Sequence, residues 1–343
     1  MHDLSYISFE GRTPTRPQHS SARGACTGAI ARSAREEHLD EFIAWVLGRA
    51  GLDAAAYRAP PLDRRLPACL RALKVSSTHA ARGLLERKPR LIAKVISSLL
   101  IGVTEFFREP GVFDFLQTQV LPALAGNNRR LRIWSAACST GAELYSMAIL
   151  LSEAGLLEQS CLLGSDCRGD AIEHAKLGLY DAAMLKLVTG ATRDKYFEPA
   201  GQEWRPVEAL RRQVHWKVAD LLAGVEDGPW DIILWRNTAI YLKPCPAGTV
   251  WRRLVSVLAP QGVLIAGKAD RPPPDAGLTH VARCIYRRSP RPPAVGHHVH
   301  VVGRMGEGQG VRADRSPLLS GEGGHHVGPH VPMVAVGVRE HFL

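Results

Sequence analysis

The chain has 343 residues, 45% of them hydrophobic and 22% charged, which is enough for one large globular domain or two of ordinary size. Its seven cysteines form no Cys-x-x-Cys pair, no signal-peptide pattern is present, and no run reaches the ~18 apolar residues of a membrane span. These features argue against a disulfide framework, a cysteine zinc site and membrane insertion, and they predict a cytoplasmic protein.

The formal net charge of +10 is compatible with simple solubility, with an acidic protein partner or with nucleic acid. Few aromatic residues lie among the basic ones, so base stacking has little support. Nucleic acid is therefore the least favoured of the three, and we predict that it is not a partner.

The first 35 residues are rich in Ser, Thr, Arg, Gly and Ala without periodicity, and we expect them to be disordered. Helical spacing starts near Glu36, and further helices are predicted over 62–73, 79–87 and 91–100. Pro67 should begin or kink the first of these. Residues 36–101 are therefore expected to form a small helical domain.

From residue 131 onward, short apolar runs alternate with helical stretches. The runs are 131–136, 161–165, 231–234 and 262–266, and the helical stretches are 142–154, 169–177 and 246–258. This alternation predicts an α/β domain with a mostly parallel sheet and helices on both faces. Residues 214–218 form a further candidate strand, and 280–286 a candidate antiparallel edge strand.

The tail, 289–343, is rich in Gly and Pro and holds half of the chain's histidines. They are His297, His298, His300, His325, His326, His330 and His341. A His-rich tract can bind metal. We favour a disordered extension instead and predict no metal site, because no helix or strand is expected there to fix ligand geometry.

Polar residues follow the predicted strands at their carboxyl ends. Glu143 opens the helix after the Gly141 turn, and Asp166 ends the run 161–165. An acidic residue in the latter place can accept both hydroxyls of a ribose. Asp220-Leu221 could flank an adenine ring, and Arg236-Asn237 end the run 231–234. Together they suit a nucleoside lying across this edge of the sheet, whereas any one of them alone could be an ordinary strand cap.

The phosphate-binding motifs that usually accompany such a site are missing. The chain has no G-x-x-x-x-G-K-[ST], and no G-x-G-x-x-G follows the first predicted strand. Triphosphates and dinucleotides are therefore disfavoured. A nucleoside ligand without phosphates points to S-adenosylmethionine, with S-adenosylhomocysteine as the product.

Five segments in order resemble the CheR-type chemotaxis-receptor glutamate O-methyltransferases over about 36–288. They are T-E-F-F-R-E from Thr104, W-S-A-A-C-S-T-G-A-E-L-Y from Trp134, S-D before a helix ending G-L-Y, R-N-T-A-I-Y from Arg236, and L-A-P-Q-G from Leu258. The resemblance implies a Rossmann-like methyltransferase domain over 102–288, with a short β-subdomain near 197–214, behind the helical domain. It also implies cofactor contacts from Thr104, Arg108, Glu143, Asp166, Asp220, Leu221, Arg236 and Asn237.

The chain departs from the family pattern at several places. The family's S-D-I-D is Ser165-Asp166-Cys167-Arg168, which loses the second acid. The family's N-L is Asp220-Leu221 in this chain, and its G-E-E is G-A-E. The family's G-x-S-E is G-K-A-D from Gly267, and Gly102 stands where the family usually has Asn. Together these changes could weaken cofactor affinity.

The implied reaction is in-line transfer of a methyl group from a sulfonium to a glutamate carboxylate. The carboxylate is already ionised near neutral pH, so catalysis reduces to positioning and to removal of water. By resemblance, Arg108 and Tyr241 would border the methyl group. As alternatives, Arg108 could pair with Glu105 or Glu109 on a helix surface, and Tyr241 could be a partly buried strand-end aromatic.

By resemblance the substrate is the acidic, helical cytoplasmic part of chemotaxis receptors. Basic residues of the second helical segment could meet it, unless they form only a solvated face: Arg58, Arg64, Arg65, Arg71 and Lys74. The short segment 197–214 makes us expect no peptide tethering, and we expect a monomer. Two rivals remain, a nucleic-acid methyltransferase and a CheR-like scaffold or regulator that has lost turnover.

Overall fold

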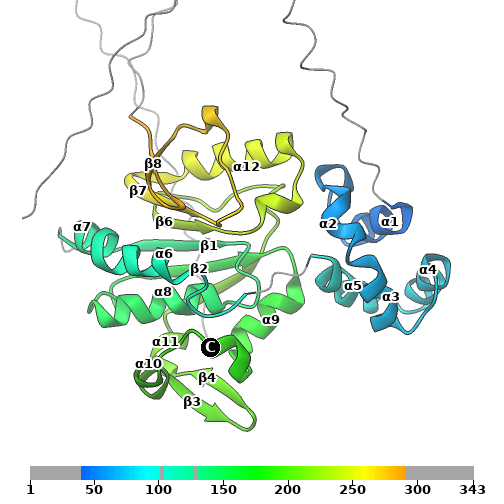
Figure 1. The fold of residues 1–343 in the computed structure, drawn as a ribbon, viewed down its shortest axis with the longest axis horizontal. Coiled ribbons are helices and arrows are strands. Elements are labelled where there is room, and N and C mark those ends of the chain that lie inside the picture. Colours follow the sequence, from blue (N-terminus) through cyan, green and yellow to red (C-terminus); the bar gives the residue numbers. More distant parts are fainter. Residues whose placement is uncertain (1–39, 101–103, 127–129, 291–343) are drawn as a thin grey trace, which may run out of the picture. The chain divides into compact units, whose positions relative to one another are not determined.

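The computed structural model describes residues 40–100, 104–126 and 130–290 (Figure 1). The predicted disordered segment 1–35 and nearly all of the tail 289–343, with its seven histidines, lie outside the described residues, and so does Gly102. Among the described residues, no helix is long and apolar enough to cross a membrane.

Residues 40–100 form five short helices: α1 (Glu41–Arg49), α2 (Ala59–Asp63), α3 (Leu66–Leu73), α4 (Thr78–Arg87) and α5 (Leu91–Leu99), with the 3₁₀ turn η1 (Ala54–Ala56) between the first two. Asp40 caps α1 by accepting the backbone N–H of Phe42. The single helix predicted over 62–73 is wrong. Two helices lie there, and α3 begins with Pro67 in its first turn, where a missing N–H costs nothing.

The sheet has seven strands in the order β5-β2-β1-β6-β7-β9-β8. Their bounds are β1 (Arg132–Ala136), β2 (Cys161–Asp166), β5 (Val214–Val218), β6 (Trp230–Trp235), β7 (Leu258–Ala266), β8 (Leu278–Ala282) and β9 (Ile285–Arg288). The first five in the order are parallel, and β9 pairs antiparallel with both β7 and β8. The predicted α/β class with a helical N-terminal region is confirmed.

The predicted single edge strand 280–286 is wrong. The segment turns back at Cys284, whose φ is 65°, and forms the hairpin β8–β9. β9 lies against β7, so β8 is the edge strand. A tight turn without glycine gave no signal in the sequence.

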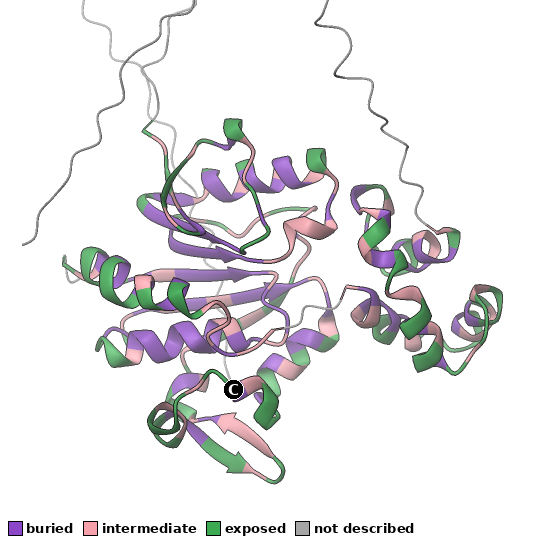
Figure 2. Ribbon diagram, viewed as in Figure 1, coloured by how far each residue is buried: buried purple, intermediate pink, exposed green. Residues whose placement is uncertain are grey.

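Helices cover both faces of the sheet, and β6 is buried along its whole length (Figure 2). The elements are α8 (Ala142–Glu153), α9 (Gly169–Leu177), α12 (Pro244–Ser256) and a continuous helical stretch of α6 (Pro110–Phe115), η2 (Leu116–Val120) and α7 (Leu121–Ala125). Alternate residues of β6 face different cores, because Ile233 belongs to one apolar cluster and Ile232 to the other.

A small hairpin, β3 (Phe197–Ala200) with β4 (Glu203–Pro206), forms a second sheet in the segment where a short β-subdomain was expected. The remaining elements are η3 (Ala182–Leu185), α10 (Gly190–Tyr196), α11 (Glu208–Arg211), η4 (Ala239–Tyr241) and η5 (Pro274–Ala276). Trp204 of this hairpin exchanges backbone hydrogen bonds with Tyr180, which ties the hairpin to the segment after α9.

The N-terminal helices share one apolar cluster with the sheet, including Leu47 of α1, Leu99 of α5 and Trp235 of β6. Backbone hydrogen bonds reinforce the contact, because Arg58 N–H donates to the Tyr241 carbonyl and Lys243 N–H to the Ala56 carbonyl. The helices and the sheet are therefore packed as one body over these residues.

Candidate active site

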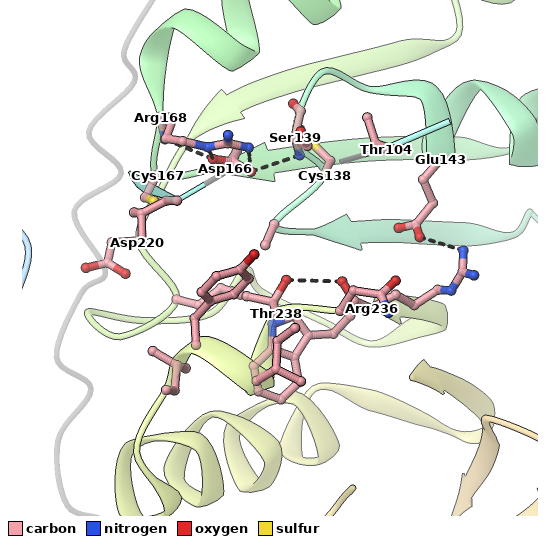
Figure 3. A pocket seen from close by; sticks show the side chains of 18 of the residues that line it. Thr104, Cys138, Ser139, Glu143, Asp166, Cys167, Arg168, Asp220, Arg236 and Thr238 are labelled. Carbon is pink, nitrogen blue, oxygen red and sulfur yellow. Dashed lines mark hydrogen bonds and ion pairs between the residues drawn. The ribbon is translucent and has the colours of Figure 1, made fainter. Parts of the chain in front are cut away.

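One pocket lies at the carboxyl ends of β1, β2, β5 and β6 (Figure 3). All nine residues predicted from the sequence to bind cofactor or act in catalysis line it: Thr104, Arg108, Glu143, Asp166, Asp220, Leu221, Arg236, Asn237 and Tyr241. Parallel strands end at one edge, so residues far apart in sequence meet there.

The turn between β1 and α8 forms one wall. Ala137 and Ser139 have φ of 60° and 54°, values that residues other than glycine rarely adopt. Where such values do occur, they often lie at functional sites. Gly141 has a φ of 88°, and a Cβ there would lie 2.5 Å from the Trp216 ring. Glycine is therefore required at this turn. Glu143 follows in the first turn of α8 and accepts the Ser135 hydroxyl at 2.7 Å.

Asp166 ends β2 and is 4% exposed. Its Oδ2 accepts the Ser139 N–H at 2.8 Å, and its Oδ1 accepts the Arg168 N–H at 3.0 Å. The Arg168 side chain adds a two-pronged ion pair, Nε to Oδ1 at 2.9 Å and Nη2 to Oδ2 at 3.2 Å. Burial lowers the pKa of Arg168, but the hydrogen bonds and charge of Asp166 more than offset this, and the net shift is upward.

Arg236, directly after β6, is a buried arginine that pairs with two carboxylates. Its Nη1 lies 3.0 Å from Glu143 Oε2, and its Nη2 donates to the Arg108 carbonyl at 2.6 Å and lies 3.4 Å from Glu109 Oε2. A buried guanidinium requires such partners. The arrangement joins the ends of β1 and β6 to the segment 104–109.

Asn237 follows with a φ of 57°. Asp270, 1% exposed, holds this conformation because its Oδ2 accepts the N–H groups of both Asn237 and Gly267. Burial raises the pKa of Asp270, and these backbone hydrogen bonds partly counter the shift. Although G-x-S-E is replaced by G-K-A-D, the last residue, Asp270, still supplies a carboxylate, and this carboxylate fixes the backbone at Asn237 and Gly267.

The lining also includes apolar and aromatic side chains. Leu221, 9% exposed, lines the pocket, as does Tyr57 from the N-terminal helices. Burial raises the pKa of Asp220, and the hydrogen bond from the Leu222 N–H to its Oδ1 opposes this. An acceptor beside apolar walls suits a heteroaromatic ring with an amino group.

Arg108 and Tyr241 both line the pocket. Arg108 lies in the turn before α6 and not on a helix. Arg65 of the N-terminal helices lies beside Tyr241, with its Nη2 3.4 Å from the phenol oxygen. Two positively charged side chains, Arg65 and Arg108, therefore line the same pocket as the Tyr241 phenol.

The sequence did not predict that Tyr57, Arg65 and Arg168 line the pocket. It also did not predict that two carboxylates, Glu109 and Asp270, bind the residues that line it. Tyr57 gave no signal, and Arg65 was expected only as part of a substrate-binding face. Arg168 was visible only as a departure from a family pattern. Among the described residues, no group of three or more His, Cys, Asp or Glu side chains is placed to hold a metal.

Comparison with known proteins gives a consistent result. The SAM-binding domain of the CheR methyltransferase family matches residues 102–283, more than half of the chain. A chemotaxis protein methyltransferase of Klebsiella aerogenes is 30% identical over 263 residues, 74% of this chain and 87% of that protein. One of Listeria monocytogenes serovar 1/2a is 28% identical over 239 residues, 69% of this chain and 91% of that protein. The probable biofilm formation methyltransferase WspC of Pseudomonas aeruginosa is 30% identical over 240 residues, 67% of this chain and 56% of that protein.

Proposed function

Because this chain belongs to the CheR family of S-adenosylmethionine-dependent methyltransferases, we propose that it methylates glutamate side chains of chemotaxis receptors. The products would be glutamate methyl esters, as in sensory adaptation, and S-adenosylhomocysteine. The observation that carries the proposal is that the nine residues predicted as cofactor contacts or catalytic residues, which lie far apart in the sequence, line one pocket at the edge of the sheet.

The pocket residues fit the cofactor, with one exception. Asp220, Leu221 and Tyr57 offer an acceptor and apolar walls for adenine. Glu143, whose Oε2 is 3.0 Å from Arg236, gives a paired acid and base for the amino and carboxylate groups of the methionyl part. The exception is Asp166, the expected ribose ligand, because Arg168 already pairs with its carboxylate.

The bound cofactor would supply a methyl group made electrophilic by the sulfonium. Arg108 would orient the incoming carboxylate through charge-assisted hydrogen bonds. Tyr241 would donate a hydrogen bond and exclude water from the reacting carboxylate. A glutamate is ionised near neutral pH, so no residue needs to act as a general base.

The N-terminal helices supply a basic face for the acidic receptor. Arg64 directly after α2, Arg71 on α3 and Lys74 directly after α3 are exposed, whereas Arg65 turns toward Tyr241. Exposed charges of one sign favour encounter with the opposite sign and fix its orientation. The partner would be the cytoplasmic helical part of a receptor, and we propose a monomeric, cytoplasmic enzyme.

A second candidate follows from the similarity to WspC, which is named for biofilm formation. In this candidate the chemistry is the same, but the substrate protein acts in biofilm formation. A third, a scaffold without turnover, is favoured by the pairing of Asp166 with Arg168.

The test is transfer of radiolabelled methyl from S-adenosylmethionine by the full chain to purified cytoplasmic receptor fragments of both kinds. Label released by mild alkali as methanol, and lost when the fragment's candidate glutamates are changed to alanine, would support glutamyl esters. Alkali-stable label would refute the ester reaction. Failure of the folded chain to bind S-adenosylhomocysteine, together with no transfer to any fragment, would favour the scaffold.

A further inference from the structure

The carboxylate of Asp166 has no acceptor site left. An ionised carboxylate offers about four lone-pair positions, two on each oxygen. Oδ1 accepts from the Arg168 backbone N–H and Nε, and Oδ2 accepts from the Ser139 N–H and Arg168 Nη2, at distances between 2.8 and 3.2 Å. Two ribose hydroxyls could not add to this set without displacing a donor.

Two of the four donors are backbone groups that cannot move independently. The Ser139 N–H is fixed in the left-handed turn after β1, and the Arg168 N–H is fixed at the start of α9. The other two donors, Nε and Nη2, both belong to the guanidinium at the end of the flexible Arg168 side chain. Arg168 lines the pocket together with Asp166 and Ser139 (Figure 3).

The ion pair is well formed. The side chains of Arg168 and Asp166 are only 8% and 4% exposed, and the guanidinium meets the carboxylate with two parallel N–H donors. Such a geometry is stronger than a single charge-assisted bond. Because the pair is buried, water screens the attraction between the two charges only weakly. A ligand that binds Asp166 must therefore displace the guanidinium and not only water.

We propose that Arg168 competes with the cofactor's ribose for Asp166, so that the enzyme binds its cofactor only when the guanidinium leaves the carboxylate. The inference rests on the proposed function, since it concerns the same pocket. The apparent dissociation constant is the intrinsic one divided by the fraction of molecules in the open state. Arg168 therefore sets the affinity for S-adenosylmethionine and its product.

The test is calorimetric titration of the full chain with S-adenosylhomocysteine and with an analogue whose two ribose hydroxyls are replaced by hydrogen. Arg168→Leu removes the competitor and leaves both backbone donors. Arg168→Lys keeps the charge but cannot form the fork. Arg211→Leu is the matched control, because Arg211 is also a partly buried, carboxylate-paired arginine (22% exposed) but does not line the pocket.

We expect Arg168→Leu to bind S-adenosylhomocysteine on the order of tenfold more tightly, Arg168→Lys to fall between it and the wild type, and Arg211→Leu to match the wild type. The dideoxy analogue should gain nothing, because it does not use Asp166. Arg168→Lys carries the test by itself if the leucine variant does not fold.

Weaker binding of S-adenosylhomocysteine in both variants would overturn the proposal, because Arg168 would then hold Asp166 in place for the ribose. An equal gain for both ligands would overturn it as well, since the effect would not pass through the hydroxyls. Folded wild-type and variant proteins that all fail to bind would refute the proposed function together with this inference. Binding by the variants alone would support both.

Discussion

Gly267 is the position where a single methyl group should damage the site most directly. A Cβ on Gly267 would lie 2.5 Å from both the backbone N and the side-chain Nδ2 of Asn237. Carbon and nitrogen atoms in contact normally stay ~3.5 Å or more apart, so the overlap is about 1 Å. The backbone N cannot move away cheaply, because it donates to the buried Asp270 carboxylate.

Overpacking of this kind costs about 1–3 kcal/mol, and replacing glycine returns ~0.4–1 kcal/mol by restricting the unfolded chain. Gly267→Ala should therefore lower the free energy of unfolding by about 1–2 kcal/mol. Asn237 must also shift, and we expect the affinity for S-adenosylhomocysteine to fall by roughly tenfold or more, since each factor of ten corresponds to about 1.4 kcal/mol.

Urea unfolding and calorimetric titration measure the two effects. Gly111→Ala is the control, because Gly111 lies in the first turn of α6 and a Cβ there meets nothing within 4 Å. It should leave affinity unchanged and stability equal or slightly higher. A Gly267→Ala protein with wild-type stability and affinity would refute the reasoning, because the approach of Asn237 to Gly267 would then not be needed.

Three further variants test other parts of the site. Tyr241→Phe should lower kcat for methyl transfer roughly 10- to 100-fold while the affinity for S-adenosylhomocysteine changes less than about twofold; unchanged turnover would remove Tyr241 from the reaction. Arg236→Met should cost about 3–5 kcal/mol of unfolding free energy, because Glu143 loses its buried partner, whereas Arg212→Met, whose ion pair is exposed, should cost under ~1 kcal/mol. Similar urea midpoints for these two variants would contradict the burial argument. Burial raises the pKa of Asp220, so folding disfavours its ionised form. The fold therefore loses stability as pH rises from the ordinary pKa of about 4 through the raised pKa of the folded protein. Asp220→Asn should therefore gain stability relative to the wild type between about pH 4 and pH 7, and a constant or shrinking difference would be inconsistent with the shift.

The central strands were readable because parallel strands buried on both faces appear as continuous apolar runs. Runs 131–136 and 161–165 agree with β1 and β2 to within one residue at each end. The prediction for 262–266 captured only the second half of β7, which starts at Leu258, because the polar and glycine residues at 260–262 interrupt the apolar run. Elements that depend on a turn without glycine or on tertiary packing, such as the β8–β9 hairpin, were not predictable from local pattern.

The site was predictable to a similar extent and for a related reason. Asp166 and Arg236 could be placed because Asp166 is the last residue of β2 and Arg236 directly follows β6, and the ends of parallel strands share one edge. The pairing of Arg168 with Asp166 depends on a side-chain rotamer, which a spacing of two residues does not determine. Tyr57 and Arg65 reach the pocket only through packing of the N-terminal helices, and nothing local in the sequence reports that.

The N-terminal helices do more than offer a surface to a substrate. The segment 56–58 exchanges backbone hydrogen bonds with residues 241–243, and Tyr57 forms a β-bridge with Leu242. Arg65, a few residues farther on, reaches the Tyr241 phenol, while the exposed Arg64 beside it faces solvent. A receptor helix that binds this basic face would contact a segment fixed directly to the proposed catalytic tyrosine. If the proposed docking is right, substrate binding and the placement of Tyr241 depend on the same short stretch of chain, and we expect changes in residues 56–65 to alter turnover as well as the affinity for the receptor.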